Sequence, residues 1–314
     1  MREGLLGDHE DTARSHFITG NIYFKRNNFT NALEAHKKAL SMKEKLLGDH
    51  EDTARSHFVI GKTYFRLREF TDALEAHKKA LIMREKLLGD HEDTAKSHYE
   101  IGNTYFRVND FIDALEAHKK SLSLREKLLG DNKETAWSHF SIGTVQLALF
   151  DFTNALESVK KALSIREKLL GDHEDTAWSH FVIGITYFYL NDFTDALEAH
   201  RKALSMREKL LGYHEDTILS HILIGVIYLA RKDSTNGLEA LKKALSMLKT
   251  LLGDDKNTVR SDFLVEDTCL ALNNLMNALE ADKKALSIGE MSRGNQEDTA
   301  FSYRSVGVIY FSFY

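Results

Sequence analysis

The strongest constraint on this chain is an internal repeat. One copy begins at Gly48 and reads GDHEDTARSHFVIGKTYFRLREFTDALEAHKKALIMREKLL. The leading glycine returns every 41 residues, at Gly7, Gly48, Gly89, Gly130, Gly171, Gly212, Gly253 and Gly294. A strict period of this length is typical of stacked units that bury their apolar faces against one another. We therefore expect a repeat architecture and not a single globule.

Each copy contains two segments with the spacing of amphipathic helices. In the copy that begins at Gly48, apolar or small residues recur three and four positions apart over 52–69 and again over 71–88. We call these segments helix A and helix B. The turn between them consists of Glu69, Phe70 and Thr71. Because so short a connection leaves no other arrangement, the two helices are expected to run antiparallel and to pack together.

Glycine and aspartate positions predict how the helices end and how closely they pack. Gly48 follows the last leucines of the preceding helix B, where a left-handed cap is expected, and Asp49 to Asp52 can supply capping oxygens to helix A. Gly61 recurs inside helix A, although a helical glycine costs about 1 kcal/mol relative to alanine. We therefore expect another backbone to approach Gly61 closely, beside the small residues Ala73 and Ala80 of helix B.

The same positions resemble a known repeat family. Gly61, Tyr64, Phe70, Ala73 and Ala80 match the pattern of the tetratricopeptide repeat. The added junction LLGDHEDTA is similar to the longer repeat of kinesin light chains and nephrocystin-like proteins, although these usually have proline where this junction has glutamate. The resemblance covers essentially the whole chain. It implies an all-α fold, a right-handed α-solenoid of about seven antiparallel helix pairs.

We expect one elongated solenoid over residues 1–314. Its predicted parts are a partial helix B at 1–6, repeats one to seven at about 7–47, 48–88, 89–129, 130–170, 171–211, 212–252 and 253–293, and an unpaired helix A at 298–314. Repeat seven departs furthest from the pattern, so we expect 257–275 to be the least stable helix. Since the chain starts and stops within a repeat, we also expect it to be an excerpt of a longer array.

Composition limits the classes of partner and the cellular compartment that we expect for this chain. The net charge is −5, which disfavours a phosphate-binding footprint, so no nucleic acid is expected as a partner. Cys269 is the single cysteine and indicates a reducing compartment. No apolar run approaches about 18 residues and no secretory start is visible, so we expect a cytoplasmic chain without a membrane partner. Self-association through open solenoid ends is a further expectation.

The fifteen histidines are read as structural and not as catalytic or metal-binding. They fall in three columns of the repeat, one at the junction, one in helix A and one in helix B. A catalytic histidine is needed once, beside a particular nucleophile or carboxylate, whereas a residue copied every 41 positions belongs to the framework. We therefore predict no enzyme activity, no metal site and no cofactor.

Positions that vary while the framework stays constant are the best candidates for binding. On helix A the face opposite His57, Gly61 and Tyr64 is expected to line the concave groove of a tetratricopeptide array. This face is basic in repeats one to three and apolar in repeats four to six. The predicted peptide-binding residues are Arg14, Asn21, Lys25, Arg55, Lys62, Arg66, Lys96, Asn103, Arg107, Trp137, Trp178, Ile185 and Tyr189.

Two aromatic features leave alternatives open. Phe58 and Phe65 flank the packing face and are interpreted as packing residues in preference to groove wall. Trp137 and Trp178 replace basic residues in an outward column, which favours a partner site. They could instead meet a neighbouring part of a longer protein or a second copy of the chain.

The first functional hypothesis is a non-enzymatic scaffold that binds an acidic peptide or partner segment with an apolar portion. The alternative is the repeat or sensor region of a larger signalling protein, such as a NOD-like receptor or a kinesin light chain-like protein. Kinesin light chains use this groove for cargo, but their asparagine pair is Phe58 and Val59 here. The two-carboxylate clamp of chaperone-binding members does not match either.

Overall fold

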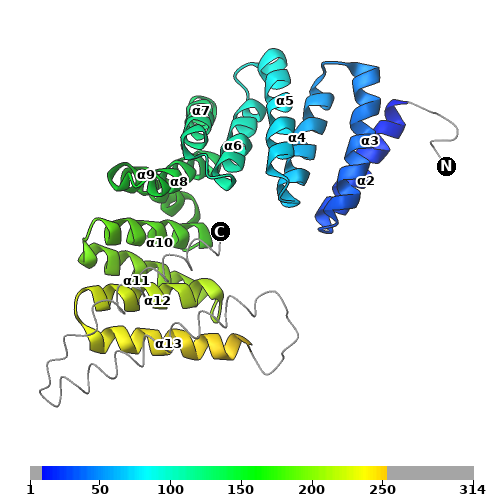
Figure 1. Ribbon diagram of the computed structural model, residues 1–314. Coiled ribbons are helices and arrows are strands. Elements are labelled where there is room, and N and C mark those ends of the chain that lie inside the picture. Colours follow the sequence, from blue (N-terminus) through cyan, green and yellow to red (C-terminus); the bar gives the residue numbers. More distant parts are fainter. Residues whose placement is uncertain (1–8, 253–314) are drawn as a thin grey trace, which may run out of the picture. The chain divides into compact units, whose positions relative to one another are not determined.

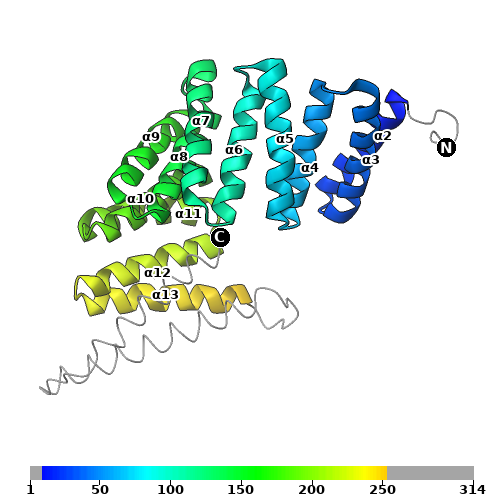
Figure 2. The same ribbon diagram turned by 45° about the horizontal axis from the view of Figure 1, so that its top comes forward.

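The computed structural model describes residues 9–252, which form helices joined by short turns and contain no strand (Figures 1 and 2). The all-α solenoid fold predicted above is confirmed. The helices are α2 (Glu10–Lys25), α3 (Phe29–Leu47), α4 (Glu51–Arg66), α5 (Phe70–Leu88), α6 (Glu92–Arg107), α7 (Phe111–Leu129), α8 (Lys133–Ala148), α9 (Phe152–Leu170), α10 (Glu174–Tyr189), α11 (Phe193–Leu210), α12 (Glu215–Ala230) and α13 (Ser234–Leu252). Repeat seven, the helix expected at 257–275 and the helix expected at 298–314 lie outside the described residues.

By contacts the chain divides into two compact units, residues 1–169 and 170–314. In the first unit each helix A packs on the helix B that follows it, as α2 does on α3, and each helix B packs on the next helix A, as α3 does on α4 (Figure 1). In the second unit α10, α11, α12 and α13 pack successively in the same way. The boundary falls at the junction between repeats four and five.

The turn between helices A and B lies earlier than the sequence predicted. Helix α4 ends at Arg66 and α5 begins at Phe70, so 67–69 form the turn. Arg68 takes a positive φ of 64°, and the Glu69 amide donates to the Tyr64 carbonyl at 3.0 Å. This pattern closes a helix with a left-handed residue. Periodicity missed it because the left-handed residue is not glycine: the equivalent residues are Asn27, Arg68, Asn109, Phe150, Asn191 and Lys232.

The start of helix A is capped by histidine in every described repeat except the fourth, whereas aspartate oxygens were expected. The backbone N–H of Asp52 donates to His50 Nδ1 at 3.2 Å, and the same bond of 3.1–3.2 Å forms at His9, His91, His173 and His214. In repeat four Asn132 takes this place and accepts from the Thr135 amide at 2.8 Å. The junction histidines therefore satisfy amides that the helix leaves unpaired. The glycine cap prediction is confirmed, since Gly48 has a φ of 58°.

The glycine column of helix A makes room for a side chain, and not primarily for a second backbone as predicted. A Cβ placed on Gly61 would lie 2.7 Å from the ring of His77, and one on Gly143 would lie 2.4 Å from Val159 Cγ2. Backbone also approaches Gly143, but less closely, with the Ala155 carbonyl oxygen at 3.1 Å. Each glycine thus accommodates the residue of helix B sixteen positions later: His36, His77, His118, Val159, His200 and Leu241.

A buried cation near the end of helix B joins three helices, and the sequence analysis did not identify it. Arg84 Nη1 donates at 2.9 Å to both the Asp93 carbonyl and Ser97 Oγ, in the first turns of the next helix A. Its guanidinium also lies 4.3 Å from the ring centroid of Phe58, in the helix A of its own repeat. The equivalent cations, all buried, are Lys43, Arg84, Arg125, Arg166 and Arg207.

The interpretation of the Phe58 column as packing is confirmed by these contacts. Equivalent rings lie 4.3–4.5 Å from the buried cations in repeats one, three, four and five. Attraction between a cation and an aromatic face is worth up to about 2 kcal/mol where water is excluded. In repeat six the cation and ring are both replaced, by Leu248 and Ile222, which belong to one buried apolar cluster. The buried cation and its aromatic ring are therefore replaced together in repeat six.

The buried cation and its ring are expected to be energetically coupled. Arg84→Leu should lower the free energy of unfolding by about 2 kcal/mol, because two charge-assisted hydrogen bonds and a cation–π contact are lost. Phe58→Ile should cost about 1–1.5 kcal/mol, as a modest change of buried volume does. The double variant copies repeat six and should cost about 1 kcal/mol less than the sum, measured by urea unfolding. Strict additivity would show that the two side chains act independently.

The helix B histidines are expected to make the fold sensitive to acid. Burial lowers the pKa of His77, His118 and His200 from 6.5 to about 3, so the folded chain keeps these imidazoles neutral. Their contribution to stability is complete above pH 6.5, the pKa of an unfolded histidine. It is lost as the pH falls toward 3, at about 1.4 kcal/mol per pH unit for each histidine.

The triple variant His77→Val, His118→Val and His200→Val isolates this effect, because repeat four already has Val159 in the same place. Urea unfolding at pH 7 and pH 5 should show a much smaller loss of stability for the variant than for the natural chain. Equal losses would mean that these histidines do not control the acid sensitivity.

Candidate functional site

The predicted basic residues of the first unit lie on the exposed side of its A helices. Arg14 and Lys25 on α2, Arg55, Lys62 and Arg66 on α4, and Lys96 and Arg107 on α6 are all exposed. Helix α4 contacts α6, and α6 contacts α8. Helices α4, α6 and α8 therefore lie in one row, and the exposed faces of α2, α4 and α6 bear these cations.

Most of these cations have no acidic partner among the described residues. Arg14, Lys25, Arg55, Lys62 and Arg66 form no ion pair there; Arg55 and Arg66 instead lie 5.5 and 5.4 Å from the centroids of Phe17 and Phe29. The B helices differ: beside a lysine such as Lys78, which lies 5.2 Å from the ring centroid of Tyr105, each of α3, α5, α7, α9 and α11 has a lysine that pairs with a glutamate one turn earlier. These pairs are Lys38–Glu34, Lys79–Glu75, Lys120–Glu116, Lys161–Glu157 and Lys202–Glu198, at 2.6–2.9 Å.

The remaining polar candidates are partly engaged within the chain. Asn21 Oδ1 lies 3.3 Å from His36 Nε2, and Asn103 Nδ2 donates to Glu100 Oε2 at 3.2 Å. Lys96 Nζ lies 3.3 Å from Asp93 Oδ1 and 3.8 Å from Glu92 Oε2. The uncompensated charge is therefore concentrated on α2 and α4.

The two tryptophans pack against the buried arginines. Trp137 lies 5.1 Å from the Arg166 guanidinium, and Trp178 lies 5.1 Å from that of Arg207. Trp178 also stacks on Phe181, with centroids 5.2 Å apart. Both indoles are half-buried. Each indole, together with the phenylalanine of the same repeat, encloses the guanidinium. This packing explains why a large ring occupies the position, without the need for a binding partner.

The apolar surface expected in repeats five and six is mostly covered. Ile185 is only 7% exposed, and Leu219 and Val226 are buried as well. Val226 packs in a cluster with Leu238 and Leu241 of α13. Of the predicted groove residues in the second unit, Tyr189 alone is exposed, at 42%. The sequence did contain a signal of this burial, because α12 is apolar on nearly all of its faces, as a helix enclosed by others is.

The histidines form no metal centre within residues 9–252. Those of helix A pair with a glutamate of the preceding helix B: His57 Nε2 lies 3.3 Å from Glu44 Oε1, and His139 Nε2 lies 3.3 Å from Glu126 Oε1. Burial lowers the pKa of His57 and His139, while the glutamate beside each opposes the shift. These contacts hold neighbouring repeats together, as the structural interpretation predicts.

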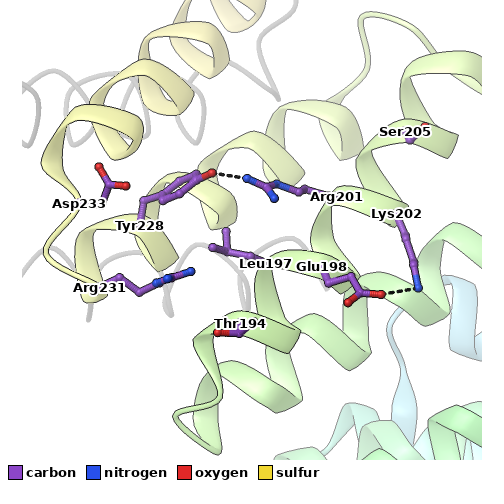
Figure 3. A pocket seen from close by; sticks show the side chains of 9 residues that line it. All are labelled: Thr194, Leu197, Glu198, Arg201, Lys202, Ser205, Tyr228, Arg231 and Asp233. Carbon is purple, nitrogen blue, oxygen red and sulfur yellow. Dashed lines mark hydrogen bonds and ion pairs between the residues drawn. The ribbon is translucent and has the colours of Figure 1, made fainter.

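A cavity in the second unit was not foreseen from the sequence. It is lined by residues of α11, by Tyr228 of α12 and by Arg231 and Asp233 after α12 (Figure 3). The sequence contained one signal of this cavity: Arg231 occupies a repeat position that holds Leu67, Val108, Leu149 and Leu190 in repeats two to five.

In the described part of the chain, no helix is apolar and long enough to cross a bilayer.

Comparison with solved structures shows the same fold at low sequence identity. A protein of Podosopora anserina with nearly identical TPR-like repeats of the kinesin light chain type has a TM-score of 0.58 and 17% identity, over 65% of this chain and 99% of that one. BtubC (BKLC) from P. vanneervenii has a TM-score of 0.63 and 17% identity, over 73% and 94%.

A third similar structure is a signal transduction ATPase with numerous domains from Pyrococcus horikoshii, which carries a tetratricopeptide repeat sensor. Its TM-score is 0.66 at 16% identity, over 95% of this chain and 42% of that one. Comparison with curated proteins by sequence gave no significant match.

The family model described as tetratricopeptide repeat matches four overlapping windows, 11–86, 52–127, 93–168 and 134–209, which together cover more than half of the chain. Such repeats typically serve as scaffolds for interactions between proteins, and the family is generally non-enzymatic. The chain belongs to the tetratricopeptide repeat family.

Proposed function

We propose that this chain is a non-enzymatic scaffold that binds an acidic segment of a protein partner on the A helices of its first unit. The observation that carries the proposal is the contrast in charge pairing. On α3, α5, α7, α9 and α11 one exposed lysine pairs with a glutamate one turn earlier, whereas Arg14, Lys25, Arg55, Lys62 and Arg66 are exposed and form no ion pair among the described residues. A carboxylate from a partner would supply the missing charge.

The spacing of the cations suits a short extended peptide. Arg55 and Arg66 lie eleven positions apart on one helix, or about 16 Å at 1.5 Å per residue. An extended peptide covers this distance with about five residues. The guanidinium groups can bind carboxylates in a bidentate manner, and the positive face would speed association with an acidic segment.

The apolar portion proposed for the ligand has less support. Ile185 is covered, and Trp137 and Trp178 already pack on arginines. The acidic character of the partner is therefore the main specificity that we propose.

A charge-reversal experiment tests the acidic-peptide proposal. The variant Arg14→Glu, Arg55→Glu, Lys62→Glu and Arg66→Glu and the natural chain are screened against an arrayed library of peptides that carry two Asp or Glu residues three to five positions apart. The natural chain should select acidic peptides, and the variant should bind them at least tenfold more weakly, since each lost charge-assisted contact costs about 1.5 kcal/mol or more.

The matched control reverses the same number of charges on the paired face: Lys38→Glu, Lys79→Glu, Lys120→Glu and Lys161→Glu. This control should retain the peptides selected by the natural chain. If both variants lose binding equally, only the net charge matters and the A-helix site is wrong. If no acidic peptide is selected, the proposed ligand class is wrong.

A second candidate function is the sensor region of a larger signalling protein. The Pyrococcus horikoshii signal transduction ATPase favours it, because this chain matches less than half of that structure, which carries a tetratricopeptide repeat sensor. Sequencing the full transcript would test this candidate. An adjoining nucleotide-binding domain would support it, and a transcript without any further domain would reject it.

A further inference from the structure

An open cavity of about 610 Å³, lined by several charged side chains, lies in the second unit (Figure 3). Its lining residues are Thr194, Leu197, Glu198, Arg201, Lys202, Ser205, Tyr228, Arg231 and Asp233. In Figure 3 Arg201 reaches toward the middle of the cavity from α11, and Arg231 reaches in from the end of α12. Two guanidinium groups therefore approach one space from different helices.

The acidic residues of the cavity are already engaged. Glu198 Oε1 pairs with Lys202 Nζ at 2.7 Å. Asp233 accepts hydrogen bonds from the backbone amide of Asn236 at 3.2 Å and from its Nδ2 at 2.6 Å. Neither Arg201 nor Arg231 has an ion pair among the described residues. Asn236 and, more weakly, Arg231 lower the pKa of the Asp233 carboxyl, so Arg231 lies in the field of one carboxylate without forming an ion pair with it. The cavity thus contains two guanidinium groups that remain free to bind an anion.

Tyr228 adds a hydroxyl donor beside Arg201 (Figure 3). Arg201 donates a hydrogen bond to Tyr228 Oη, and its guanidinium lies 5.8 Å from the ring centroid. Because the phenolic oxygen accepts in this bond, its own proton remains available for an acceptor in the cavity. Two planar guanidinium groups and a hydroxyl form a donor set that matches the three oxygens and the double charge of a phosphate monoester.

Comparison with the other repeats indicates that these arginines are not part of the framework. At the position of Arg201 the other repeats have Lys37, Lys78, Lys119, Lys160 and Lys242. Lys78 lies 5.2 Å from the ring of Tyr105, so a lysine already satisfies the packing on the tyrosine. Arg231 stands where repeats two to five have leucine or valine. Helix packing alone therefore requires neither arginine.

From this geometry we propose that the cavity between α11 and α12 binds a phosphorylated side chain of a protein partner. A small metabolite is usually held in a largely apolar pocket that buries most of its surface. Here Leu197 is the one buried apolar side chain of the lining, and Arg201, Lys202 and Arg231 are exposed. A phosphate carried by a peptide fits such a site, because the flanking residues of the peptide add contacts outside it. This site does not depend on the A-helix face of the first unit.

The test compares phosphorylated and unphosphorylated versions of one degenerate nine-residue peptide pool with a central serine, threonine or tyrosine. Binding to the full chain is measured by fluorescence anisotropy. The natural chain should bind the phosphorylated pool at least tenfold more tightly. Arg231→Leu, which copies Leu67, should reduce this preference about tenfold, and Arg201→Lys should weaken it less because the charge is retained.

Arg26→Leu is the matched control, because Arg26 occupies the position of Arg231 in repeat one. It removes the same charge outside the cavity and should leave the preference unchanged. The proposal is overturned if the two peptide pools bind equally or if Arg26→Leu weakens binding as much as Arg231→Leu. Binding of inorganic phosphate as tightly as the phosphorylated pool would also overturn it, by showing a site for small anions.

Discussion

The array depends most on a buried cation that helix B places between two helices A in repeats one, two, three and five. In the interior of a protein a guanidinium is costly unless its donors are satisfied. Arg84 meets this condition with the Asp93 carbonyl, Ser97 Oγ and the face of Phe58. Because the carbonyl and hydroxyl belong to the next repeat and the ring to the same repeat, the cation can be satisfied only when consecutive repeats stack in register. It thus specifies the stacking as well as stabilising it.

Exchanges among the repeats show which contacts act together. Repeat six has Leu248 and Ile222 in place of the cation and its ring, and repeats four and five add Trp137 and Trp178 to the enclosure. The glycine of helix A keeps its place whether the residue facing it is His77, Val159 or Leu241. The contact between two paired positions is therefore kept from repeat to repeat, while the polarity of the side chains that make it varies. Exposed positions such as Arg231 vary without any matching change in the packing.

Much of the fold could be predicted from periodicity, and much of the site could not. The repeat length, the helix pairs and the glycine cap at Gly48 followed from spacing alone. The left-handed turn at Arg68 and the cap at His50 did not, because neither residue type has the usual preference for that role. The packing of Trp178 on Arg207 was not apparent from the sequence for a further reason. One helical wheel cannot show what a neighbouring helix covers, and Arg207 belongs to the following helix, α11.

The buried and exposed cations of this chain have opposite roles in our account. The cations near the ends of the B helices have hydrogen-bond and aromatic partners within the array. We propose that the cations on the outer face of α2 and α4 bind the carboxylates of a partner. Zero-length carbodiimide cross-linking to a selected acidic peptide, followed by mass spectrometry, tests this distinction most directly. The account predicts cross-links from the peptide to Lys25 and Lys62. Cross-links confined to the paired lysines, such as Lys38 and Lys79, would contradict it.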